Sequence, residues 1–319
     1  MIVDLPSTTT SNINKRMVEI RESGGAVTTG RVLTLVIVTD DGADTEDAVA
    51  AANEASHEHP CRVIVLARGA RKAHARLDAQ IRVGGDAGAS EVVVLRLYGP
   101  LADHADSVVV PFLLPDTPVV AWWPGEPPAV PSQDPIGQLA NRRITDASAS
   151  PSPAKALAQR HTSYADGDSD LAWSRLTPWR ALLASALDQP PFEAVSSATV
   201  TGAAESASSD LLAGWLAINL GVPVKRVRGG EGIGSVQLDR RSGPVTLVRP
   251  ADSTAVLTQP GQPDRPVALA RRQVRDCLAE ELRRLDADEV YERALQGLSL
   301  VKRSRATAKT AAGSPGRRA

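Results

Sequence analysis

The sequence predicts an α/β domain with a mainly parallel sheet, followed by an α+β domain with an antiparallel meander and helices. In the first half, continuous β-branched runs alternate with Ala-rich or irregular stretches. In the second half, short runs are separated by Gly and Pro turns. The 319 residues are enough for two domains of roughly 100–200 residues each. The predicted division is a flexible N-terminal arm (1–25), the α/β domain (26–165), the α+β domain (166–300) and a disordered basic tail (301–319).

The first 25 residues are rich in Ser, Thr and Asn and end in Ser23-Gly24-Gly25. They lack sustained hydrophobic periodicity. We therefore expect a loose arm, with the fold starting after it.

Four apolar runs, at 31–39, 61–68, 91–99 and 118–123, predict the strands of the first domain. They are apolar on both faces, which is typical of a sheet that helices cover on both sides. A helix is expected after the first run, ending near Ser56, and residues 81–84 fit an additional short edge strand. The Ser-, Ala-, Pro- and Asp-rich segment 146–170 predicts the domain boundary near its end.

The second half begins with an expected helix at 171–188, bent or re-capped at Thr177-Pro178, and a strand at 195–203. A helix at 209–222 comes before the segments VKRVRG, GSVQLDRRSGP, VTLVRP and TAVLTQPG. These four segments predict short strands of an antiparallel meander. Helices at 267–285 and 288–298 close the domain, and Asp286 or Asp288 is the expected cap of the last one.

The charge distribution argues against a nucleic-acid-binding body. The chain has a net charge of −1, whereas residues 302–319 carry six positive charges and no acid, so the rest holds −7. The chain has no apolar run near the ~18 residues of a membrane span, and its first residues lack a signal-peptide pattern. With only two Cys residues and no CxxC, we expect a cytoplasmic protein that binds neither nucleic acid nor membrane.

Motifs for catalysis or cofactor binding are weak. The glycine-rich stretch RGGEGIGS contains GxGxG, not GxGxxG, and a strand is expected after it, so a hairpin turn is favoured over a ligand loop. The acidic stretch DDGADTED follows the first strand and would repel an anionic cofactor. The segment HEHPC is better explained as a turn that enters a strand than as a metal site. No catalytic, metal-binding or cofactor-binding residue is therefore predicted.

The placement of tryptophan stands out. The chain has ten aromatic residues, of which five are Trp, and four of these fall in the segments PDTPVVAWWPGEPP and DLAWSRLTPWR. Trp and Arg are enriched at interface hot spots. The alternative is that the Trp residues fill the core while the Arg residues pair with Asp168, Asp170 or Asp188. The candidates for a partner interface are Trp122, Trp123, Trp173, Arg175, Trp179 and Arg180.

The segment DLAWSRLTPWR, together with PVVAWWPG, the region around RITDAS and ELRRLDADEVYERAL, resembles the bacterial glucose-6-phosphate dehydrogenase assembly protein family, OpcA. The resemblance runs from about Gly30 to Leu298. It implies a two-domain, non-catalytic protein that binds glucose-6-phosphate dehydrogenase, the enzyme that opens the oxidative pentose phosphate pathway. Such a protein would promote assembly or the active state of the dehydrogenase. The partner would bind substrate and NADP.

Other functions remain open from the sequence alone. One is a sugar-phosphate-binding protein or enzyme that uses Arg68, Arg175 or Arg180 as anion anchors at the sheet edge. Another is nucleic-acid association through the basic tail, although such charges more often serve solubility. Some members of the family are discussed as redox-responsive, and a switch here would require Cys61 to pair with Cys277. Two buried thiols are favoured over that pairing.

Overall fold

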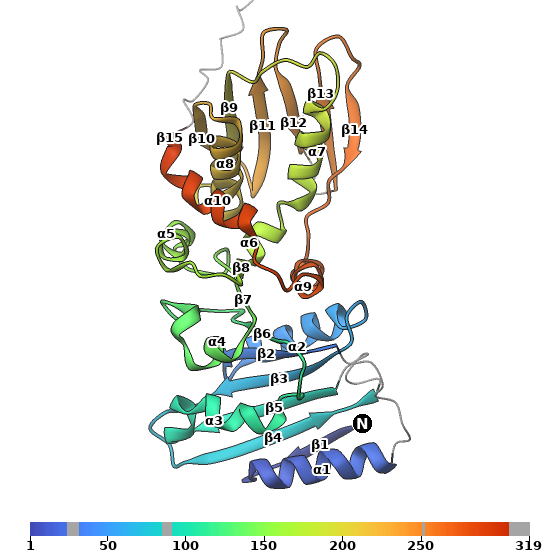
Figure 1. The fold of residues 1–319 in the computed structure, drawn as a ribbon, viewed down its shortest axis with the longest axis vertical. Helices are drawn as coiled ribbons and strands as arrows, with labels where there is room; N and C mark the ends of the chain where they lie inside the picture. The colour runs from blue at the N-terminus through green and yellow to red at the C-terminus, as the bar shows by residue number, and fades with distance from the viewer. Residues whose placement is uncertain (24–31, 85–90, 251–252, 306–319) are drawn as a thin grey trace, which may run out of the picture.

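The computed structural model describes residues 1–23, 32–84, 91–250 and 253–305. Two β-sheets lie at opposite ends of an elongated molecule, with α5 (Pro153–Ser163), α6 (Leu171–Ser174) and α9 (Val274–Arg283) between them (Figure 1). The first sheet is mainly parallel and the second largely antiparallel, and helices pack on both. The predicted fold class is confirmed for both halves.

The first sheet has eight strands in the order β1-β4-β5-β3-β2-β6-β7-β8. Along the sheet, the neighbouring strands β5, β3, β2, β6, β7 and β8 all pair in parallel. β4 is antiparallel to both of its neighbours, β1 and β5. The four predicted strands correspond to β2, β3, β5 and β6. The edge strand expected at 81–84 is longer and lies inside the sheet, because β1 pairs outside it. The strands are β1 (Ile2–Leu5), β2 (Leu33–Asp40), β3 (Cys61–Arg68), β4 (Arg76–Arg82), β5 (Glu91–Tyr98), β6 (Val119–Trp122), β7 (Arg142–Thr145) and β8 (Asp168–Asp170).

Helices cover both faces of this sheet, which explains why its central strands are apolar throughout. Side chains that alternate along a strand point to opposite faces. Leu35 and Ile37 pack with α2 (Ala43–Ala55) and α9, whereas Val36 and Val38 belong to the cluster on the other face. The elements of that other face are α1 (Thr10–Ser23), α3 (Ala105–Val109), α4 (Pro135–Leu139) and the 3₁₀ turns at Gly99–Asp103 and Val110–Phe112. A further 3₁₀ turn, Pro131–Gln133, comes before α4.

The expectation of a loose arm over residues 1–25 is wrong for the residues that the structure describes. Residues 2–5 form β1, and residues 10–23 form α1. Ile13, Met17 and Ile20 are buried, at the i, i+4 and i+7 spacing of one helix face. Those three apolar positions among polar residues are too few to stand out as a periodic pattern. They become a helix because the sheet offers an apolar surface to cover. Gly24 and Gly25 lie outside the described residues.

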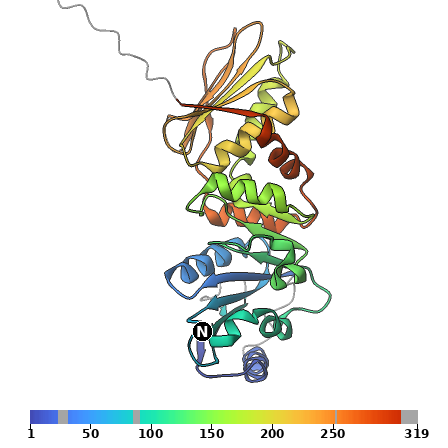
Figure 2. The ribbon, with the colours of Figure 1, turned by 90° about the vertical axis from the view of Figure 1, so that its left-hand side faces the viewer.

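The second sheet has seven strands in the order β14-β13-β12-β11-β9-β10-β15. Its helices gather on one face (Figure 2), and one apolar cluster contains α7, α8 and α10 together with the inward side chains of the strands. The elements are α7 (Thr177–Leu187), β9 (Ser197–Gly202), α8 (Ala207–Leu220), β10 (Val224–Arg228), β11 (Ile233–Asp239), β12 (Val245–Val248), β13 (Thr254–Thr258), β14 (Arg265–Ala268), α10 (Glu289–Gly297), a 3₁₀ turn (Leu298–Leu300) and β15 (Val301–Arg305).

Three expectations about this half of the chain are wrong. β10 does not join the antiparallel meander; it pairs in parallel with β9, because α8 connects the two strands as a βαβ unit. β11 then pairs on the other side of β9, so the glycine-rich stretch at 229–234 crosses over β9 and is not a hairpin turn. The helix expected from residue 267 begins at Val274, because residues 265–268 form β14.

The prediction that the chain is disordered from residue 301 onward is wrong for the first five residues of that tail. Residues 301–305 form β15, which pairs in parallel with β10 at the edge of the second sheet. The remainder of the expected tail, 306–319, lies outside the described residues.

The two halves of the chain share core residues. Cys277, Leu278 and Leu282 of α9 pack in the same cluster as Val49 and Ala52 of α2, which covers the first sheet. Conversely, Leu157 of α5, a helix that precedes β8 of the first sheet, packs in the core of the second half. Each half therefore completes its core with a helix from the other half.

Candidate functional site

The four Trp residues among the six candidates are buried. Trp122, Trp123, Trp173 and Trp179 are each 1% exposed. They are divided among three apolar clusters, since Trp122 and Trp123 face opposite sides of the first sheet and the other two lie in the second core. A direct contact of these four side chains with a partner is not compatible with this burial. They fill the core and the junction.

The segment DLAWSRLTPWR forms two short helices joined by a bend. The Asp170 carboxylate accepts a hydrogen bond from the Ala172 N–H and caps α6. α6 ends at Ser174, and Pro178 occupies the first turn of α7. The backbone N–H that proline lacks would have no partner within the helix at this position. The expected bend at Thr177-Pro178 is confirmed.

The two arginines of this segment have other partners than expected. Arg175 forms a two-pronged ion pair with Asp146, at 2.8 and 2.7 Å. Arg180 stacks on the Trp173 ring, with its guanidinium carbon 3.8 Å from the ring centroid, and donates to the Thr177 hydroxyl at 3.1 Å. The expected pairing with Asp168, Asp170 or Asp188 is therefore not seen in these contacts, and Asp168 instead pairs with Arg143. Arg175 belongs to the junction, not to an open anion site.

A buried polar network connects the two sheets through the same segment. Arg142 of β7 donates from Nε and Nη2 to Glu281 of α9, at 2.9 and 2.5 Å, and both side chains are less than 5% exposed. The Ser174 hydroxyl donates to the other oxygen of Glu281. Breaking such a buried pair by removing one partner leaves an uncompensated charge. The signal that could have found it is the presence of two arginines in the short buried strand RRIT.

Asp170 is the most deeply buried carboxylate of the network. It accepts hydrogen bonds from the Thr145 hydroxyl at 2.6 Å and from the Ala147 and Ala172 N–H groups. Burial, reinforced by the nearby carboxylate of Asp146, raises the pKa of Asp170 to about 6. The sequence pattern did not single this residue out as an ionisable core group.

Trp173 links this network to the last helix. Its indole N–H donates to the Asp288 carboxylate at 2.8 Å, and its ring lies 5.9 Å from that of Tyr291. Asp288 also accepts hydrogen bonds from the Val290 and Tyr291 N–H groups, so the cap expected at Asp286 or Asp288 is Asp288. One carboxylate thus joins α6 to α10.

Two family models match the chain. One is described as the glucose-6-phosphate dehydrogenase subunit N-terminal domain and matches residues 52–162. The other is described as the C-terminal domain of the same subunit and matches residues 166–295. The chain belongs to the OpcA family. Every candidate residue of the junction lies inside these two ranges.

A curated relative is a Synechocystis sp. protein provisionally named OxPP cycle protein OpcA, which is 28% identical over 160 residues. That match covers 47% of this chain and 32% of the relative, so the matched region spans about a third of the relative's length.

Among solved structures, a glucose-6-phosphate 1-dehydrogenase from Mycobacterium avium has 11% identity and a TM-score of 0.43, with 85% of this chain and 94% of that chain covered. A Gfo/Idh/MocA family oxidoreductase from Vibrio cholerae has 11% identity and a TM-score of 0.32, with 83% and 95% covered. Both TM-scores are too low to establish a shared fold.

The two thiols of this OpcA-family chain are free and buried, as the sequence analysis favoured. Both belong to the apolar cluster between the first sheet and α9. Burial raises the pKa of Cys277 to about 11, so its thiol is protonated and weakly nucleophilic near neutral pH. Cys277 is therefore not an activated cysteine.

Within the described parts of the OpcA-family chain, no group of three His, Cys, Asp or Glu side chains is placed to hold a metal ion. The helices that the structure describes include none with the length and apolar character needed to cross a bilayer. Arg68, the remaining anion-anchor candidate, ends β3 and lines a small pocket together with the acids Asp103 and Asp106.

Proposed function

We propose that this OpcA-family chain is a non-catalytic accessory protein that binds glucose-6-phosphate dehydrogenase and promotes its assembly or active state. The observation that carries the proposal is the pair of family matches, which cover both halves of the chain and are described as domains of a glucose-6-phosphate dehydrogenase subunit. Substrate and NADP would then be bound by the dehydrogenase itself.

Binding alone does not make an activator. A partner protein shifts an equilibrium only by as much as it prefers one conformation or oligomer over the other. A rigid body suits this role, because a surface held in one geometry loses little freedom on binding. The shared cores and the Arg142–Glu281 pair hold the two sheets in such a fixed relation.

The buried Trp residues of the junction fit this role as positioning residues. Trp173 holds α6 against Asp288 at the start of α10, and Arg180, which is partly exposed, stacks on its ring. We propose that the junction orients the neighbouring surface that meets the dehydrogenase, with Arg175 and Arg180 as the candidates for direct contact.

The test is co-purification with the cognate dehydrogenase, followed by dehydrogenase activity against glucose 6-phosphate concentration with and without this chain. We expect a stable complex and either a higher kcat, a lower KM or a larger oligomer. Absence of a complex together with unchanged kinetics would refute the proposal. Turnover of glucose 6-phosphate and NADP by the isolated chain would favour the enzyme alternative.

The positioning role of Trp173 has a matched control in the fifth tryptophan. Trp173→Phe removes the indole N–H bond to Asp288, whereas Trp215→Phe makes the same change at a partly buried position of α8. We expect the first variant to activate the dehydrogenase at least several-fold less, because α6 and α10 lose their link, and the second to act like the unmodified chain. Equal activation by two folded variants would remove Trp173 from the mechanism.

A further inference from the structure

A cavity of about 390 Å³ lies in the first half of the chain, at the carboxyl ends of β7 and β8 and beside the start of α5. β7 and β8 pair in parallel and α5 connects them, so the three elements form a βαβ unit. In α/β sheets, ligands bind outside the carboxyl ends of the strands. The lining residues that matter for a ligand are Glu126, Ser150, Ser152, Lys155 and Arg160.

The feature that points to a ligand is the side chain of Arg160. This residue is 8% exposed, and its Nη2 donates to the carbonyl oxygens of Pro128 and Ala129, both at 3.0 Å. Its Nε and Nη1 atoms are buried and have no hydrogen-bond partner in the described parts of the chain. Buried donors are nearly always paired, because an unmade hydrogen bond costs the whole desolvation of the group. Two such N–H groups in the wall of a cavity indicate an acceptor that the chain itself does not supply.

The acids near Arg160 favour an uncharged acceptor at this end of the cavity. Asp170 and Asp168 attract Arg160 through space, but the oxygens of Asp170 accept hydrogen bonds from one hydroxyl and two backbone N–H groups, and Asp168 pairs with Arg143. Glu126, the third acid that attracts Arg160, is exposed on the loop after β6. A further anion beside Arg160 would meet these carboxylates. A hydroxyl oxygen therefore suits its free N–H groups better.

The start of α5 offers a place for a negative charge. Ser152 occupies the N-cap position without making a capping hydrogen bond, and Pro153 follows it. An N-cap serine usually accepts from an N–H of the first turn, so here that side chain leaves the N–H groups to another acceptor. The helix dipole favours an anion at this end, and the exposed Lys155 adds a positive charge. A phosphate group matches this combination of donors.

Both ends of the cavity belong to the same helix. Arg160 lies about 12 Å beyond Ser152 along the helix axis, since each residue rises by roughly 1.5 Å. Side chains of a helix lean toward its N-terminus, so the long Arg160 side chain reaches back toward the first turn. A ligand that meets both ends is therefore longer than a phosphate group alone.

From this arrangement we infer that the cavity binds a phosphate monoester whose body carries hydroxyl groups, of the sugar-phosphate class. The phosphate lies at the start of α5 and accepts hydrogen bonds from the Ser152 hydroxyl, the Lys155 ammonium group and backbone N–H groups. A hydroxyl oxygen of the sugar accepts from Nε or Nη1 of Arg160. The site is built by this chain alone, so its failure and that of the proposed association with a dehydrogenase are distinguishable.

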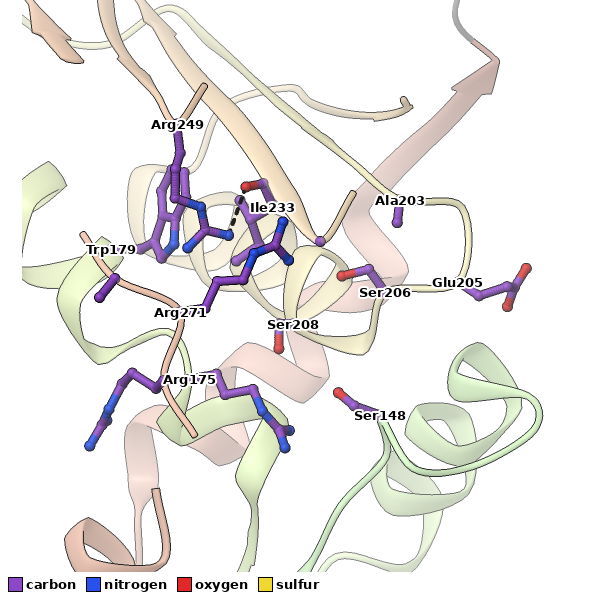
Figure 3. A pocket seen from close by; sticks show the side chains of 13 residues that line it. Ser148, Arg175, Trp179, Ala203, Glu205, Ser206, Ser208, Ile233, Arg249 and Arg271 are labelled. Atoms are coloured by element: carbon purple, nitrogen blue, oxygen red, sulfur yellow. Dashed lines mark hydrogen bonds between the residues drawn. The ribbon is translucent and has the colours of Figure 1, made fainter. Parts of the chain in front are cut away.

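The loop between β7 and α5 also borders a second cavity, of about 360 Å³, at the start of α8. Ser148 of this loop lines the second cavity, as Figure 3 shows, whereas Ser150 and Ser152 line the first. The loop thus presents serines to two different cavities. Ser148 therefore provides a matched control for Ser152.

The experiment is calorimetric titration of the full chain with ribose 5-phosphate, inorganic phosphate and ribose, supported by thermal unfolding. We expect ribose 5-phosphate to bind and to raise the unfolding midpoint, inorganic phosphate to bind more weakly, and ribose not to bind. Lys155→Gln should weaken binding of ribose 5-phosphate about threefold to tenfold, because a charge-assisted contact is lost. Arg160→Gln should weaken it at least about tenfold and leave the affinity for inorganic phosphate unchanged, because Arg160 contacts the sugar.

The controls are Ser148→Ala and Lys225→Gln. The first matches Ser152→Ala, which should weaken binding of ribose 5-phosphate about threefold. The second matches Lys155→Gln, since it removes one exposed positive charge from β10 of the second sheet. Both controls should leave binding within about twofold of the unmodified chain.

Three outcomes would overturn the inference. Absence of ribose 5-phosphate binding at millimolar concentration, or equal losses in the Lys155 and Lys225 variants, would exclude the site. Equal affinity for inorganic phosphate and ribose 5-phosphate would exclude the sugar-phosphate assignment. Because Arg160 is buried, Lys155→Gln at the exposed end of the cavity is the decisive variant if Arg160→Gln does not fold.

Discussion

Asp170 shows how one buried carboxylate couples the junction to pH. It has no exposed surface, and its oxygens accept hydrogen bonds from one hydroxyl and two backbone N–H groups. These bonds favour the ionised form, but burial and the Asp146 charge outweigh them and raise the pKa to about 6. A carboxyl group with a higher pKa in the folded than in the unfolded state binds protons more tightly when folded.

The stabilising contribution of Asp170 is therefore complete below about pH 4 and is lost as the pH rises through about 6. We expect Asp170→Asn, which keeps an acceptor for the backbone N–H groups, to remove this part of the pH dependence. The measurement is urea denaturation of both proteins from pH 4.5 to 7.5. The unfolding free energy of the unmodified chain should fall relative to the variant by an amount on the order of 1–3 kcal/mol; parallel curves would contradict the shifted pKa.

At the scale of elements, the backbones of α8 and α10 lie close together because each helix has a glycine at the contact, Gly214 and Gly297. A Cβ atom on Gly214 would lie 2.4 Å from the Ala294 carbonyl oxygen, and one on Gly297 would lie 2.1 Å from the Gly214 carbonyl oxygen. Backbone atoms cannot move aside as a flexible side chain can. This contact explains why an otherwise apolar, Ala- and Leu-rich helix contains a glycine in its middle.

Gly214→Ala separates the two helices. Alanine is favoured over glycine inside a helix by about 1 kcal/mol, but overpacking a close contact typically costs about 1–3 kcal/mol and should outweigh that gain. We expect a net loss of roughly 1–2 kcal/mol in unfolding free energy, measured by urea denaturation. Gly125→Ala is the control, because nothing lies within 4 Å of its Cβ position. A Gly214→Ala variant as stable as this control would show that the helices can separate without loss.

At the scale of the whole molecule, α9 belongs to the second half of the sequence but covers the first sheet. The stability of the first half therefore depends on the second. Residues 1–170 contain every strand of the first sheet but lack α9, so Val49, Ala52 and Cys61 would lose Leu278 and Leu282 as packing partners. Exposed apolar patches of this kind promote association.

We expect a fragment of residues 1–170 to bind a hydrophobic dye and to unfold at a markedly lower temperature than the full chain. Linking residues 274–283 to this fragment through a flexible linker should reverse both effects, because α9 supplies the missing cover. Dye fluorescence and thermal unfolding measure the outcome. A fragment that unfolds cooperatively at the temperature of the full chain would show that α9 is dispensable for the first sheet.

Strong local signals were sufficient for much of this architecture. The runs at 61–68 and 91–99 became β3 and β5 because a continuous β-branched run has few alternatives. The bend at Thr177-Pro178 and the cap at Asp288 follow from local backbone chemistry. By contrast, α1 depends on burial against a distant sheet, and the pairing of β10 depends on the path of α8. Neither leaves a local pattern.

The sequence by itself determined the fold class, most strands and the family resemblance, because these depend on short-range patterns of residue type. Only the tertiary structure decided that the four Trp residues are buried, that Arg175 pairs with Asp146, and that α9 completes the first sheet. It also placed the glycine-rich stretch above β9 and beside Arg249 and Arg271. These contacts join residues from 29 positions apart, as in the Arg175–Asp146 pair, to more than 200, as between α9 and the first sheet. They are chosen by the packing of the whole chain, which no local window of sequence contains.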